Sequence, residues 1–422
     1  MVEKLKIFIN PNPSRVLLRF LRLSDKRSLR ITESILTKTE NEVAKILVSV
    51  RSEFESRHRN FDKRLLENYK VIESRLAFNR NISQNKKLLL GAVFSMEYTT
   101  EASALFNPSI ARHPIQDDYD RLKFILSLRS TGEGHISSIS FREGYLTSDG
   151  IIDLLPGNSF VTPGKKIMSD SNKSELIADQ DISSNYDVEF GDDTDISERT
   201  LYPYSTAESM GMEDVRFVEF IENNESTYYG TYTAYNGRSI RTHMIETKDF
   251  KFFKIRSLSG EASVDKGLAL FPRKIGDDYW MISRQDGESL YTISSKDIYN
   301  WESPQLLKLP ELDWEITQIG NCGSPIELDE GWLLLTHGVG FVRKYVIGAI
   351  LLDKNNPNKI IGVMDEPLLE AVGNERNGYV PNVVYSCGSI NYKDNIIIPY
   401  AVSDTSSSFA TVSIKDVLAK MK

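Results

Sequence analysis

The N-terminal part of the chain carries hydrophobic residues at helical spacing. In residues 39–57 and again in residues 60–78, apolar side chains recur every three or four positions, and charged side chains fill the opposite face. The apolar positions are Val43, Ile46, Leu47, Val50 and Phe54 in the first run, and Phe61, Leu65, Leu66, Tyr69 and Ile72 in the second. This pattern predicts two amphipathic helices joined near residues 58–60, within a helical N-terminal extension over residues 1–88.

From about residue 88 onward the pattern changes to short β-type runs separated by Gly, Asn and Asp. Five such runs are centred on residues 122–128, 228–235, 279–282, 332–336 and 396–400. Apart from one wide gap between the first two, they recur at roughly 50 to 60 residues, which is typical of repeated sheet units that bury one another's faces. We therefore expect an all-β domain over residues 89–422, a five-bladed β-propeller, with a β-sandwich carrying long insertions as the rival fold.

The wide gap corresponds to an insertion over about residues 147–203. It contains two acidic or polar runs, residues 169–173 and residues 187–195. Neither run has the glycine and terminal glutamate that a calcium-binding EF-hand loop requires at fixed positions. We interpret the segment as a solvated insertion, and a position over one face of the propeller stays open.

Composition narrows the class of protein. The chain has 422 residues, of which 40% are hydrophobic, so it can bury a large core, and its net charge of -8 argues against a nucleic-acid or anionic membrane partner. Two cysteines provide neither a disulfide framework nor a Cys-x-x-Cys metal site. Without a recognisable signal peptide or a long apolar run, the expected location is cytoplasmic.

The polar stretch over residues 211–218 is the strongest candidate for chemistry. Glu213 and Asp214 are adjacent carboxylates beside Arg216, and an apolar run follows them. If Asp214 begins a strand, strict alternation places Asp214 and Arg216 on one face and Glu213 on the other. The alternative is a surface turn with an ion pair.

Comparable polar residues recur in each of the five units. Carboxylates and amides bind hydroxyl groups, arginine supplies planar donors, and aromatic rings cover the apolar faces of sugars, so the mixture favours a carbohydrate site. The candidates are Asn107, Arg129 and Glu133 in the first unit, Glu213, Asp214, Arg216 and Tyr232 in the second, Lys266, Arg284 and Asp286 in the third, Glu327 and His337 in the fourth, and Asp404 in the fifth.

Several segments, in collinear order over about residues 90–415, resemble glycoside hydrolase family 130. They are FNPS at 106–109, GMEDVR at 211–216, YGTYTAY at 229–235, LFPRKI at 270–275, GWLLLTHGV at 331–339, IGAILLD at 347–353, PNVVYSCG at 381–388 and AVSDT at 401–405. That family comprises β-mannoside phosphorylases and β-1,2-mannosidases on five-bladed propellers. The N-terminal helices lie outside the usual family core.

The resemblance implies roles for individual residues. Asp214 matches the general acid of the family's Glu-Asp-Pro-Arg motif, with Val215 in place of the proline. Family members are thought to pass the proton through a hydroxyl of the bound mannose, with inversion at the anomeric carbon. Asn107, Arg129 and Asp404 match positions that hold this mannose. Glu133 is a looser match, because the family's Asp-Gly-x-Ser-Arg is replaced here by the residues of 132–138.

The nucleophile separates two activities within the family. An inverting glycosidase needs a carboxylate that activates water, whereas a phosphorylase needs cations that hold phosphate. Lys266 and Arg284 match two phosphate-binding positions, but Glu327 stands where phosphorylases carry a lysine. This substitution favours an inverting β-mannosidase, most plausibly for β-1,2-linked manno-oligosaccharides, with Asp214 as acid and Glu327 as base; Asp286 and Glu288 are rival bases.

Two alternatives stay open at this stage. One is a β-mannoside phosphorylase that produces mannose 1-phosphate, with Lys266, Arg284 and His337 holding phosphate. The other is a carbohydrate-binding propeller without catalysis. In each case we expect an oligosaccharide ligand, no metal and no cofactor, with inorganic phosphate as co-substrate only for the phosphorylase. Self-association through the N-terminal helices is a further expectation.

Overall fold

The computed structural model describes residues 2–77, 80–118, 120–147, 150–168 and 184–422. The chain divides into two compact units. The smaller comprises Asn12–Thr100 and Asn158–Thr162, and the larger comprises Met1–Pro11, Glu101–Gly157 and Pro163–Lys422. This division differs from the expected boundary at residue 88, because the first strand of the chain belongs to the larger unit and residues beyond 88 still belong to the smaller one.

The smaller unit packs four helices with a two-stranded sheet. Its elements are β2 (Val16–Phe20), α1 (Asp25–Leu36), α2 (Glu40–Phe54), α3 (Phe61–Arg75), α4 (Gln84–Val93) and β3 (Ser95–Thr99). Helices α2 and α3 confirm the two predicted helices, and a capping box between Thr39 and Glu42 fixes the start of α2. Within the described residues, no helix combines the length and apolar character needed to cross a membrane.

Helices α1 and α4 were not predicted, for opposite reasons. Helix α1 buries Ser28 and Thr32 beside Ile35, so its buried stripe is too polar to recognise. Helix α4 buries three consecutive leucines, Leu88 to Leu90, so its apolar run shows no helical period.

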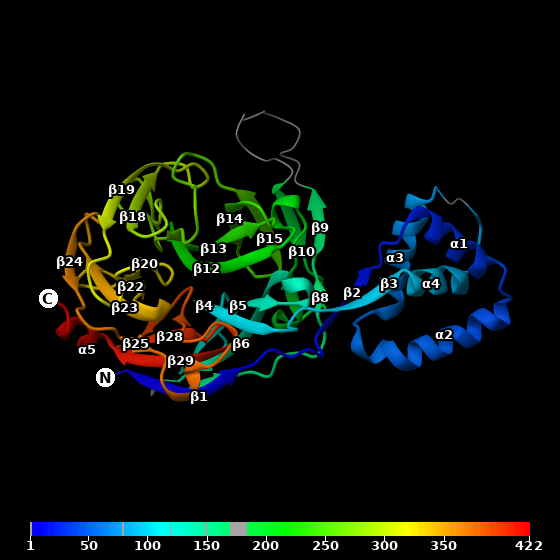
Figure 1. The fold of residues 1–422 in the computed structure, drawn as a ribbon, viewed down its shortest axis with the longest axis horizontal. Coiled ribbons are helices and arrows are strands. Elements are labelled where there is room, and N and C mark those ends of the chain that lie inside the picture. Colours follow the sequence, from blue (N-terminus) through cyan, green and yellow to red (C-terminus); the bar gives the residue numbers. More distant parts are fainter. Residues whose placement is uncertain (1, 78–79, 119, 148–149, 169–183) are drawn as a thin grey trace. The chain divides into compact units, whose positions relative to one another are not determined.

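The larger unit consists mainly of antiparallel strands that form five successive meanders (Figure 1). The first contains β4 (Ala104–Arg112), β5 (Leu122–Thr131) and β6 (Ser137–Leu146); the second β12 (Gly211–Glu222), β13 (Glu225–Tyr235), β14 (Ile240–Thr247) and β15 (Phe252–Ser257); the third β16 (Ala269–Leu270), β17 (Tyr279–Ser283), β18 (Leu290–Ser295) and β19 (Glu302–Lys308); the fourth β20 (Gln318–Asn321), β22 (Trp332–Val339), β23 (Tyr345–Leu352) and β24 (Ile360–Val363); and the fifth β26 (Val384–Tyr385), β28 (Asn395–Val402), β29 (Ser406–Ser413) and β1 (Glu3–Ile9). Strand β1 pairs with β29, so the two ends of the chain complete the fifth meander together. None of the sheets formed by the described residues closes on itself.

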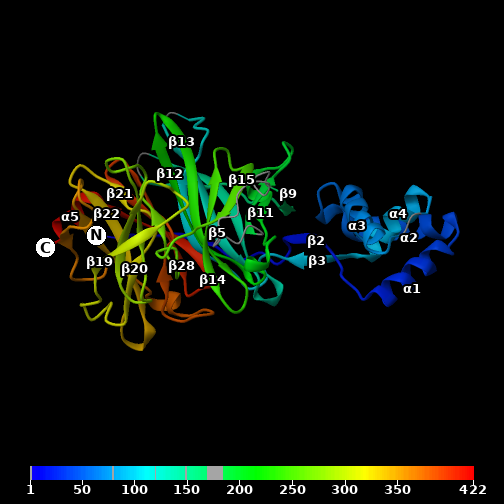
Figure 2. The ribbon, with the colours of Figure 1, turned by 90° about the horizontal axis from the view of Figure 1, so that it is seen from above.

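Shorter elements extend these meanders. They are β7 (Ile152–Leu154), β8 (Thr162–Pro163), β9 (Lys165–Met168), β10 (Tyr186–Glu189), β11 (Arg199–Leu201), β21 (Ile326–Glu327), β25 (Leu369–Glu370), β27 (Ile390–Tyr392) and the C-terminal helix α5 (Ile414–Ala419). Figure 2 shows the long strands β12 and β13 side by side, in agreement with their antiparallel pairing.

All five predicted strand centres are strands, and each is the second strand of its meander: β5, β13, β17, β22 and β28. A second strand has a neighbour on both edges and other sheets on both faces, so it needs a nearly continuous apolar sequence. In β22, for example, every residue from Trp332 to Val339 is buried. The strongest hydrophobic runs of the sequence therefore mark the interior strands.

The described part of the 147–203 insertion is not a solvated loop, so that interpretation was wrong there. Strand β10 pairs with β15 on one side and β9 on the other, which widens the second meander. Tyr186, Val188 and Phe190 alternate along this segment and are each no more than 1% exposed. The acidic residues between and after them, beginning with Asp187 and Glu189, hid a strand of period two. The polar run 169–173 lies outside the described residues.

Candidate active site

A residue with a left-handed backbone lies within or just before the first strand of several meanders. Asn107, Asp214, Asp265 and Asn382 have φ values of 48°, 55°, 59° and 62°. Asparagine and aspartate tolerate this region better than other side chains with a Cβ. At Asn107 and Asp214 the pairing register also shifts, which marks a β-bulge in β4 and in β12. Such bulges turn a side chain away from its regular direction.

The bulge in β12 changes the expected placement of the two adjacent acids. Strict alternation would separate Glu213 from Asp214 across the sheet, but both carboxylates contact the same guanidinium. Arg129 Nη2 donates to Glu213 Oε1 over 2.6 Å, and Arg129 Nη1 donates to Asp214 Oδ1 over 3.1 Å. The prediction from alternation was therefore wrong, because the left-handed residue interrupts the strand.

A second set of polar residues comes from the connections between the second and third strands of the meanders. In the first and fourth meanders this connection contains a single 3-10 turn, Glu133–His135 and Phe341–Arg343 respectively. Four of these connections place a residue at a pocket, and in the second meander the last residue of β13 does so; the residues are His135, Arg284, Arg343 and Asp404, and Tyr235. The starts of the first strands and these connections together build the site.

The main pocket has a volume of about 320 Å³. It brings together eight of the residues predicted from sequence: Asn107, Arg129, Asp214, Arg216, Lys266, Arg284, His337 and Asp404. With Arg343, five cationic side chains line the pocket against two carboxyl groups, those of Asp214 and Asp404. The pocket thus combines carboxyl groups, which can bind sugar hydroxyls, with a lining that is mostly cationic.

Asp214 lies deep in this pocket among hydrogen-bond donors. Asn107 Nδ2 donates to Asp214 Oδ1 over 2.7 Å, alongside the contact from Arg129. Burial alone would raise the pKa of Asp214, but Arg129, Lys266 and the Asn107 amide favour the charged form and lower the pKa to about 2. Asp214 is therefore a carboxylate in the unliganded pocket at neutral pH.

Glu213 accepts hydrogen bonds from two of the cationic side chains. Besides accepting from Arg129, its other oxygen accepts from Lys266 Nζ over 2.9 Å. Glu213 is only 7% exposed, and a buried carboxylate needs such partners. It holds the Arg129 and Lys266 side chains in position and lines a neighbouring pocket.

Arg216 links several meanders at the floor of the main pocket. It is 3% exposed, and its guanidinium donates to Asn321 Oδ1 over 3.1 Å, to the Asp214 carbonyl over 2.8 Å and to the Tyr385 hydroxyl over 2.6 Å. Asn321 in turn donates to the Gly267 carbonyl. Because Arg216 fixes the backbone of Asp214, it positions the acid.

The opposite wall is cationic but includes a neutral histidine. Arg284 Nε donates to Asp265 Oδ2 over 3.0 Å, and Lys266 and Arg343 lie on the same pocket. Burial, followed by the charges of Arg284 and Arg216, lowers the pKa of His337 to about 3. His337 can therefore bind an anion only as a neutral hydrogen-bonding group.

Asp404 contrasts with Asp214. Burial and the charge of Asp214 raise its pKa to about 6, although Arg129 and Arg343 oppose the shift. Asp404 lines both the main pocket and a neighbouring pocket of about 230 Å³, as do Phe106, Arg129 and Tyr379. The two pockets are therefore contiguous, and the rings of His135 and Tyr379 lie 6.1 Å apart at the second one.

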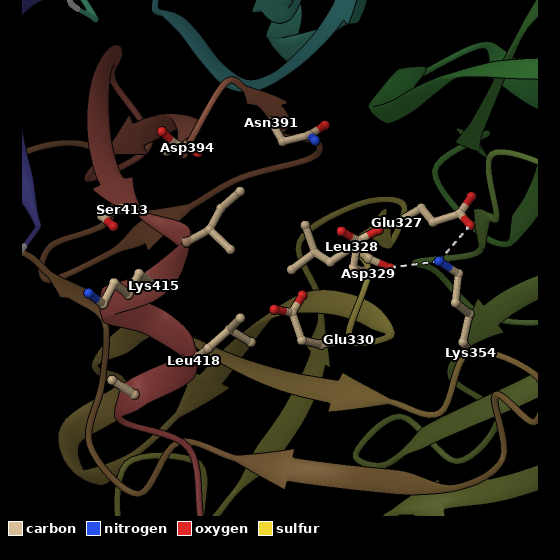
Figure 3. Close-up of a pocket in the computed structure, with 12 residues that line it drawn as sticks. Glu327, Leu328, Asp329, Glu330, Lys354, Asn391, Asp394, Ser413, Lys415 and Leu418 are labelled. Carbon is tan, nitrogen blue, oxygen red and sulfur yellow. Dashed lines mark hydrogen bonds and ion pairs between the residues drawn. The ribbon is translucent and has the colours of Figure 1, made fainter.

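Glu327, the predicted base, does not lie with Asp214. It belongs to the short strand β21 and lines two other pockets, of about 970 and 490 Å³. Its carboxylate accepts from Arg273 Nε over 2.8 Å and from Arg273 Nη2 over 2.7 Å. Figure 3 shows its contact with Lys354, whose Nζ lies 3.5 Å from Glu327 Oε1. Pairing of β21 with β22 directs this side chain to Arg273, so Glu327 does not line the main pocket, and its role as water-activating base stays a prediction.

Three of the predicted sugar-binding residues and one rival base also lie elsewhere. Tyr232 is 1% exposed and donates to the buried Glu208. Asp286 caps its own turn, accepting from the backbone of Glu288 over 2.9 Å and of Ser289 over 2.7 Å. Glu133 and Glu288 are exposed and are not among the residues lining the main pocket. Aspartate and glutamate next to glycine were more simply turn residues.

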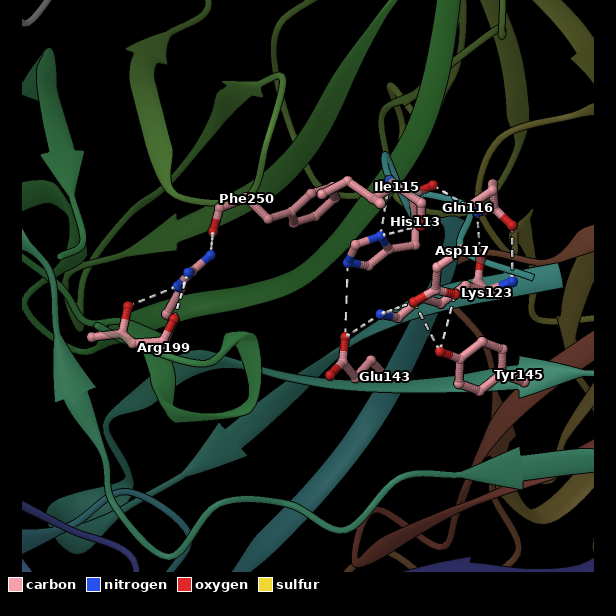
Figure 4. Close-up of polar contacts among 10 residues, drawn as sticks. His113, Ile115, Gln116, Asp117, Lys123, Glu143, Tyr145, Arg199 and Phe250 are labelled. Carbon is pink, nitrogen blue, oxygen red and sulfur yellow. Dashed lines mark hydrogen bonds and ion pairs between the residues drawn. The ribbon is translucent and has the colours of Figure 1, made fainter. Parts of the chain in front are cut away.

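A separate polar cluster gathers around the connection between β4 and β5 (Figure 4). His113 Nε2 lies 3.7 Å from Glu143, and Lys123 Nζ lies 3.2 Å from Asp117, which also accepts from the Tyr145 hydroxyl over 3.1 Å. These contacts tie the hairpin together. We assign them a structural role.

Several lining residues received no role in the site prediction. They are His135, Gln318, Asn321, Arg343, Tyr345, Tyr379 and Tyr385. Arg343 had a recognisable signal, because it occupies the same connection in the fourth meander that His135 occupies in the first. Tyr379 had none, since it lies in a long connection outside the repeat.

Sequence comparison with known proteins points to the family that the motifs resemble. The sequence model of glycoside hydrolase family 130, described as beta-1,4-mannooligosaccharide phosphorylase, matches residues 170–422. A beta-1,2-mannobiose phosphorylase of Listeria innocua is 30% identical over 232 residues, which span 53% of this chain and 63% of that protein. A 1,2-beta-oligomannan phosphorylase of a Thermoanaerobacter species is 33% identical over 216 residues, spanning 50% of this chain and 71% of that protein.

The fold of the larger unit also has a solved counterpart. The structure of the Listeria innocua phosphorylase in complex with beta-1,2-mannobiose superposes with a TM-score of 0.53 at 19% identity, over 76% of this chain and 92% of that one. The alignment thus reaches across most of a solved relative, while the sequence match covers less than two thirds of the same relative's length.

Proposed function

The chain belongs to glycoside hydrolase family 130, and from this premise we propose that it is a β-mannoside phosphorylase that transfers a mannosyl group to inorganic phosphate. The observation that carries the proposal is the composition of one pocket: Lys266, Arg284 and Arg343 line the same 320 Å³ as Asp214. Phosphate at neutral pH carries between one and two negative charges, and such cations favour its binding.

Hydrolysis is less well supported by the pocket. A water-activating base must face the acid across the sugar ring, and Glu327 is held by Arg273 on another part of the unit. Among the described residues lining the pocket, the only other carboxyl group is that of Asp404, which lies next to Arg129 and Arg343 and takes up a proton near pH 6. The cationic wall therefore suits phosphate better than a general base.

In the proposed reaction, a mannosyl residue lies against Asn107, Arg129 and Asp404, with phosphate on the side of Lys266, Arg284 and Arg343. Phosphate attacks the anomeric carbon, the glycosidic bond breaks, and a proton reaches the leaving oxygen through the Asp214 end of the pocket. Attack opposite the leaving group inverts the anomeric carbon, so a β-mannoside gives α-mannose 1-phosphate. His337, uncharged, adds a hydrogen bond and no charge.

The sugar beyond the cleaved bond is proposed to occupy the neighbouring 230 Å³ pocket. His135, Tyr235 and Tyr379 offer aromatic surfaces there, and Glu213 and Thr131 offer hydrogen-bonding groups. The two relatives described above are named for β-1,2-linked substrates. We therefore propose β-1,2-linked manno-oligosaccharides as the substrate class.

We also infer that the five meanders close into a five-bladed propeller around this pocket. Consecutive meanders touch one another: Phe217 N donates to Ser109 Oγ over 3.1 Å, Ile221 N to the Pro272 carbonyl over 3.0 Å, and Ile319 N to the Glu288 carbonyl over 2.8 Å. Bridges Tyr345–Val383 and Ser109–Gly388 add the fourth-to-fifth and fifth-to-first contacts. A ring of neighbours supports closure and does not fit a β-sandwich.

One assay tests the activity. Purified protein is incubated with β-1,2-mannobiose, and separately with β-1,4-mannobiose, each with and without inorganic phosphate. We expect mannose 1-phosphate and mannose in equal amounts from the β-1,2-linked substrate, and only when phosphate is present. Release of free mannose alone, at a rate independent of phosphate, would establish hydrolysis instead. Turnover of neither disaccharide would argue against both enzyme readings.

A further inference from the structure

The two carboxyl groups of the main pocket have opposite surroundings. Asp214 accepts hydrogen bonds from Asn107 Nδ2 over 2.7 Å and from Arg129 Nη1 over 3.1 Å, both at the same oxygen. In the part of the chain that the structure describes, no group donates a hydrogen bond to the Asp404 carboxyl, and no cation lies within ion-pair distance of it. The site therefore contains one carboxylate with two hydrogen-bond donors, Asp214, and one carboxyl group without a donor among the described residues, Asp404.

The groups that face Asp404 do not supply the missing partner. The carboxylate of Asp214 on β12 opposes its ionisation, while Arg129 on β5 and Arg343 on the 3-10 turn Phe341–Arg343 favour ionisation from a distance. In the neighbouring pocket it lies with His135, Tyr379 and Glu213. A buried acid beside an ionised acid, with no donor of its own, is more stable with its proton.

The backbone fixes this arrangement. Ser403 and Asp404 have φ values of 47° and 52° at the connection between β28 and β29, and Asp214 has a φ of 55° within the β12 bulge. Both side chains are thus aimed by left-handed residues on different meanders. Because Asn107 Nδ2 and Arg129 Nη1 both donate to Asp214 Oδ1, the carboxylate cannot turn toward Asp404 without breaking those contacts.

We propose that Asp404 holds the proton that the reaction consumes, and that Asp214 receives it only when the hydroxyl groups of a bound mannoside connect the two carboxyl groups. This inference rests on the proposed phosphorylase function. It separates the residue that stores the proton from the residue nearest the scissile bond. Asp404 accordingly acts through Asp214, as a positioning and proton-supplying group.

The proton balance of the step is closed. The bond from the anomeric carbon to the glycosidic oxygen breaks, the bond to a phosphate oxygen forms, and the Asp404 proton ends on the leaving sugar hydroxyl by way of the bound sugar and Asp214. Hydrogen phosphate loses its own proton when it becomes the dianionic sugar phosphate. That proton returns to Asp404, so the enzyme regains its starting state without another reactant.

The location of the proton is tested on the unliganded protein by infrared difference spectroscopy across a pH titration. Wild type should show the carbonyl band of a protonated carboxyl group that disappears with a midpoint near the pKa of about 6 expected for Asp404. The band should be absent in Asp404→Asn and present in Asp214→Asn, where the midpoint should fall because the neighbouring charge is gone. In Arg343→Gln the midpoint should rise.

Asp286→Asn is the matched control, since Asp286 caps a turn outside the pocket. This variant should titrate as wild type does. If the band near pH 6 persists in Asp404→Asn, or disappears in Asp214→Asn, the proposal is overturned. The Arg343→Gln titration keeps the test open should either aspartate variant fail to fold.

Kinetics test the transfer itself. At saturating phosphate, kcat/KM for β-1,2-mannobiose should decline above about pH 6 in wild type and in Asp286→Asn. Asp404→Asn should lose that decline and at least about 100-fold in kcat. A raised KM with an unchanged pH profile would reduce Asp404 to a sugar-binding residue. Absence of turnover in wild type would refute the proposed function, and the infrared titration would still decide where the proton resides.

Discussion

Arg273 donates two parallel hydrogen bonds to the carboxylate of Glu327, Nε to Oε2 over 2.8 Å and Nη2 to Oε1 over 2.7 Å. The side chain of Arg273 also lies over the Trp332 ring, 4.9 Å from its centroid. A carboxylate engaged in this way is occupied as a hydrogen-bond acceptor on both oxygens. The acid that sequence reasoning assigned to water activation is therefore a structural partner on the surface of the fourth meander.

The first prediction concerns Glu327→Gln. Because Glu327 lies outside the pocket of Asp214, phosphate-dependent turnover should stay within about twofold of wild type. The free energy of unfolding should fall by about 1 kcal/mol or less, since the two side chains are 33% and 38% exposed and water screens the pair. Steady-state kinetics and urea unfolding measure the two effects. A loss of 100-fold or more, the scale expected for a missing general base, would restore the hydrolase assignment.

The second prediction concerns Arg284→Gln. If the cationic wall binds phosphate, removing one charge-assisted hydrogen bond should cost about 1.5–3 kcal/mol of phosphate binding. KM for phosphate should then rise about 10- to 100-fold, with a smaller change in KM for the mannoside. Lys354→Gln is the matched control, because Lys354 lines a different pocket with Glu327. Equal increases in both KM values for Arg284→Gln would place this arginine at the sugar instead.

Tyr232→Phe should affect stability and leave substrate binding intact. The Tyr232 hydroxyl donates to Glu208 and lies 3.2 Å from His243 Nδ1, inside the second meander. Loss of this buried hydrogen bond should lower the free energy of unfolding by about 1–2 kcal/mol. KM for β-1,2-mannobiose should not change. A selective rise in that KM, at unchanged stability, would return Tyr232 to the sugar site where the sequence placed it.

Tyr379→Ala tests the neighbouring pocket. Tyr379 is 67% exposed, so its removal should change the free energy of unfolding by less than about 0.5 kcal/mol. If its ring covers the sugar beyond the cleaved bond, the loss of about 1 kcal/mol of stacking should raise KM for manno-oligosaccharides about fivefold. Phe8→Ala, which removes a 54% exposed ring from the edge strand β1, is the control. An unchanged KM would argue against this pocket as an acceptor site.

Much of the fold was predictable because interior strands must be apolar on both faces. Strands β5, β13, β17, β22 and β28 show this directly, and the amphipathic helices α2 and α3 show the equivalent helical pattern. The sequence failed where burial was achieved with other residues. Strand β10 alternates its core residues with Asp187 and Glu189, and helix α1 buries hydroxyl groups, so neither pattern was visible.

For the site, type of residue was more informative than position. Eight predicted residues meet in one pocket, since the first strands and the connections between second and third strands bring their acids, amides and cations to one place. The sequence did not show in which direction each side chain points. A left-handed backbone at Asp214 brings Glu213 and Asp214 to the same guanidinium, and the short strand β21 directs Glu327 away from both. Bulges and short strands decide such directions, and their sequence signals are weak.

The pH dependence of stability should differ between the two pocket acids, beginning with Asp214. Its folded-state pKa of about 2 lies below the ordinary 3.8, so it stabilises the fold above pH 3.8 and loses this contribution as pH falls toward 2. The contribution of Asp214 to the free energy of unfolding should be on the order of 2 kcal/mol. Acid unfolding of wild type should therefore be steeper than that of Asp214→Asn between pH 4 and 2.

Asp404 should show the opposite sign. Its folded-state pKa of about 6 exceeds the ordinary 3.8, so the folded state binds the proton more tightly, and the resulting stability is complete below pH 3.8 and is lost as pH rises through 6. Asp404→Asn removes the ionisable group. The free energy of unfolding of this variant, relative to that of wild type, should therefore increase by on the order of 3 kcal/mol between pH 4 and 7. Urea unfolding at a series of pH values measures this difference. A flat difference curve across that range would show that Asp404 ionises as freely in the folded protein as in the unfolded chain, and the proton store inferred for the pocket would not exist.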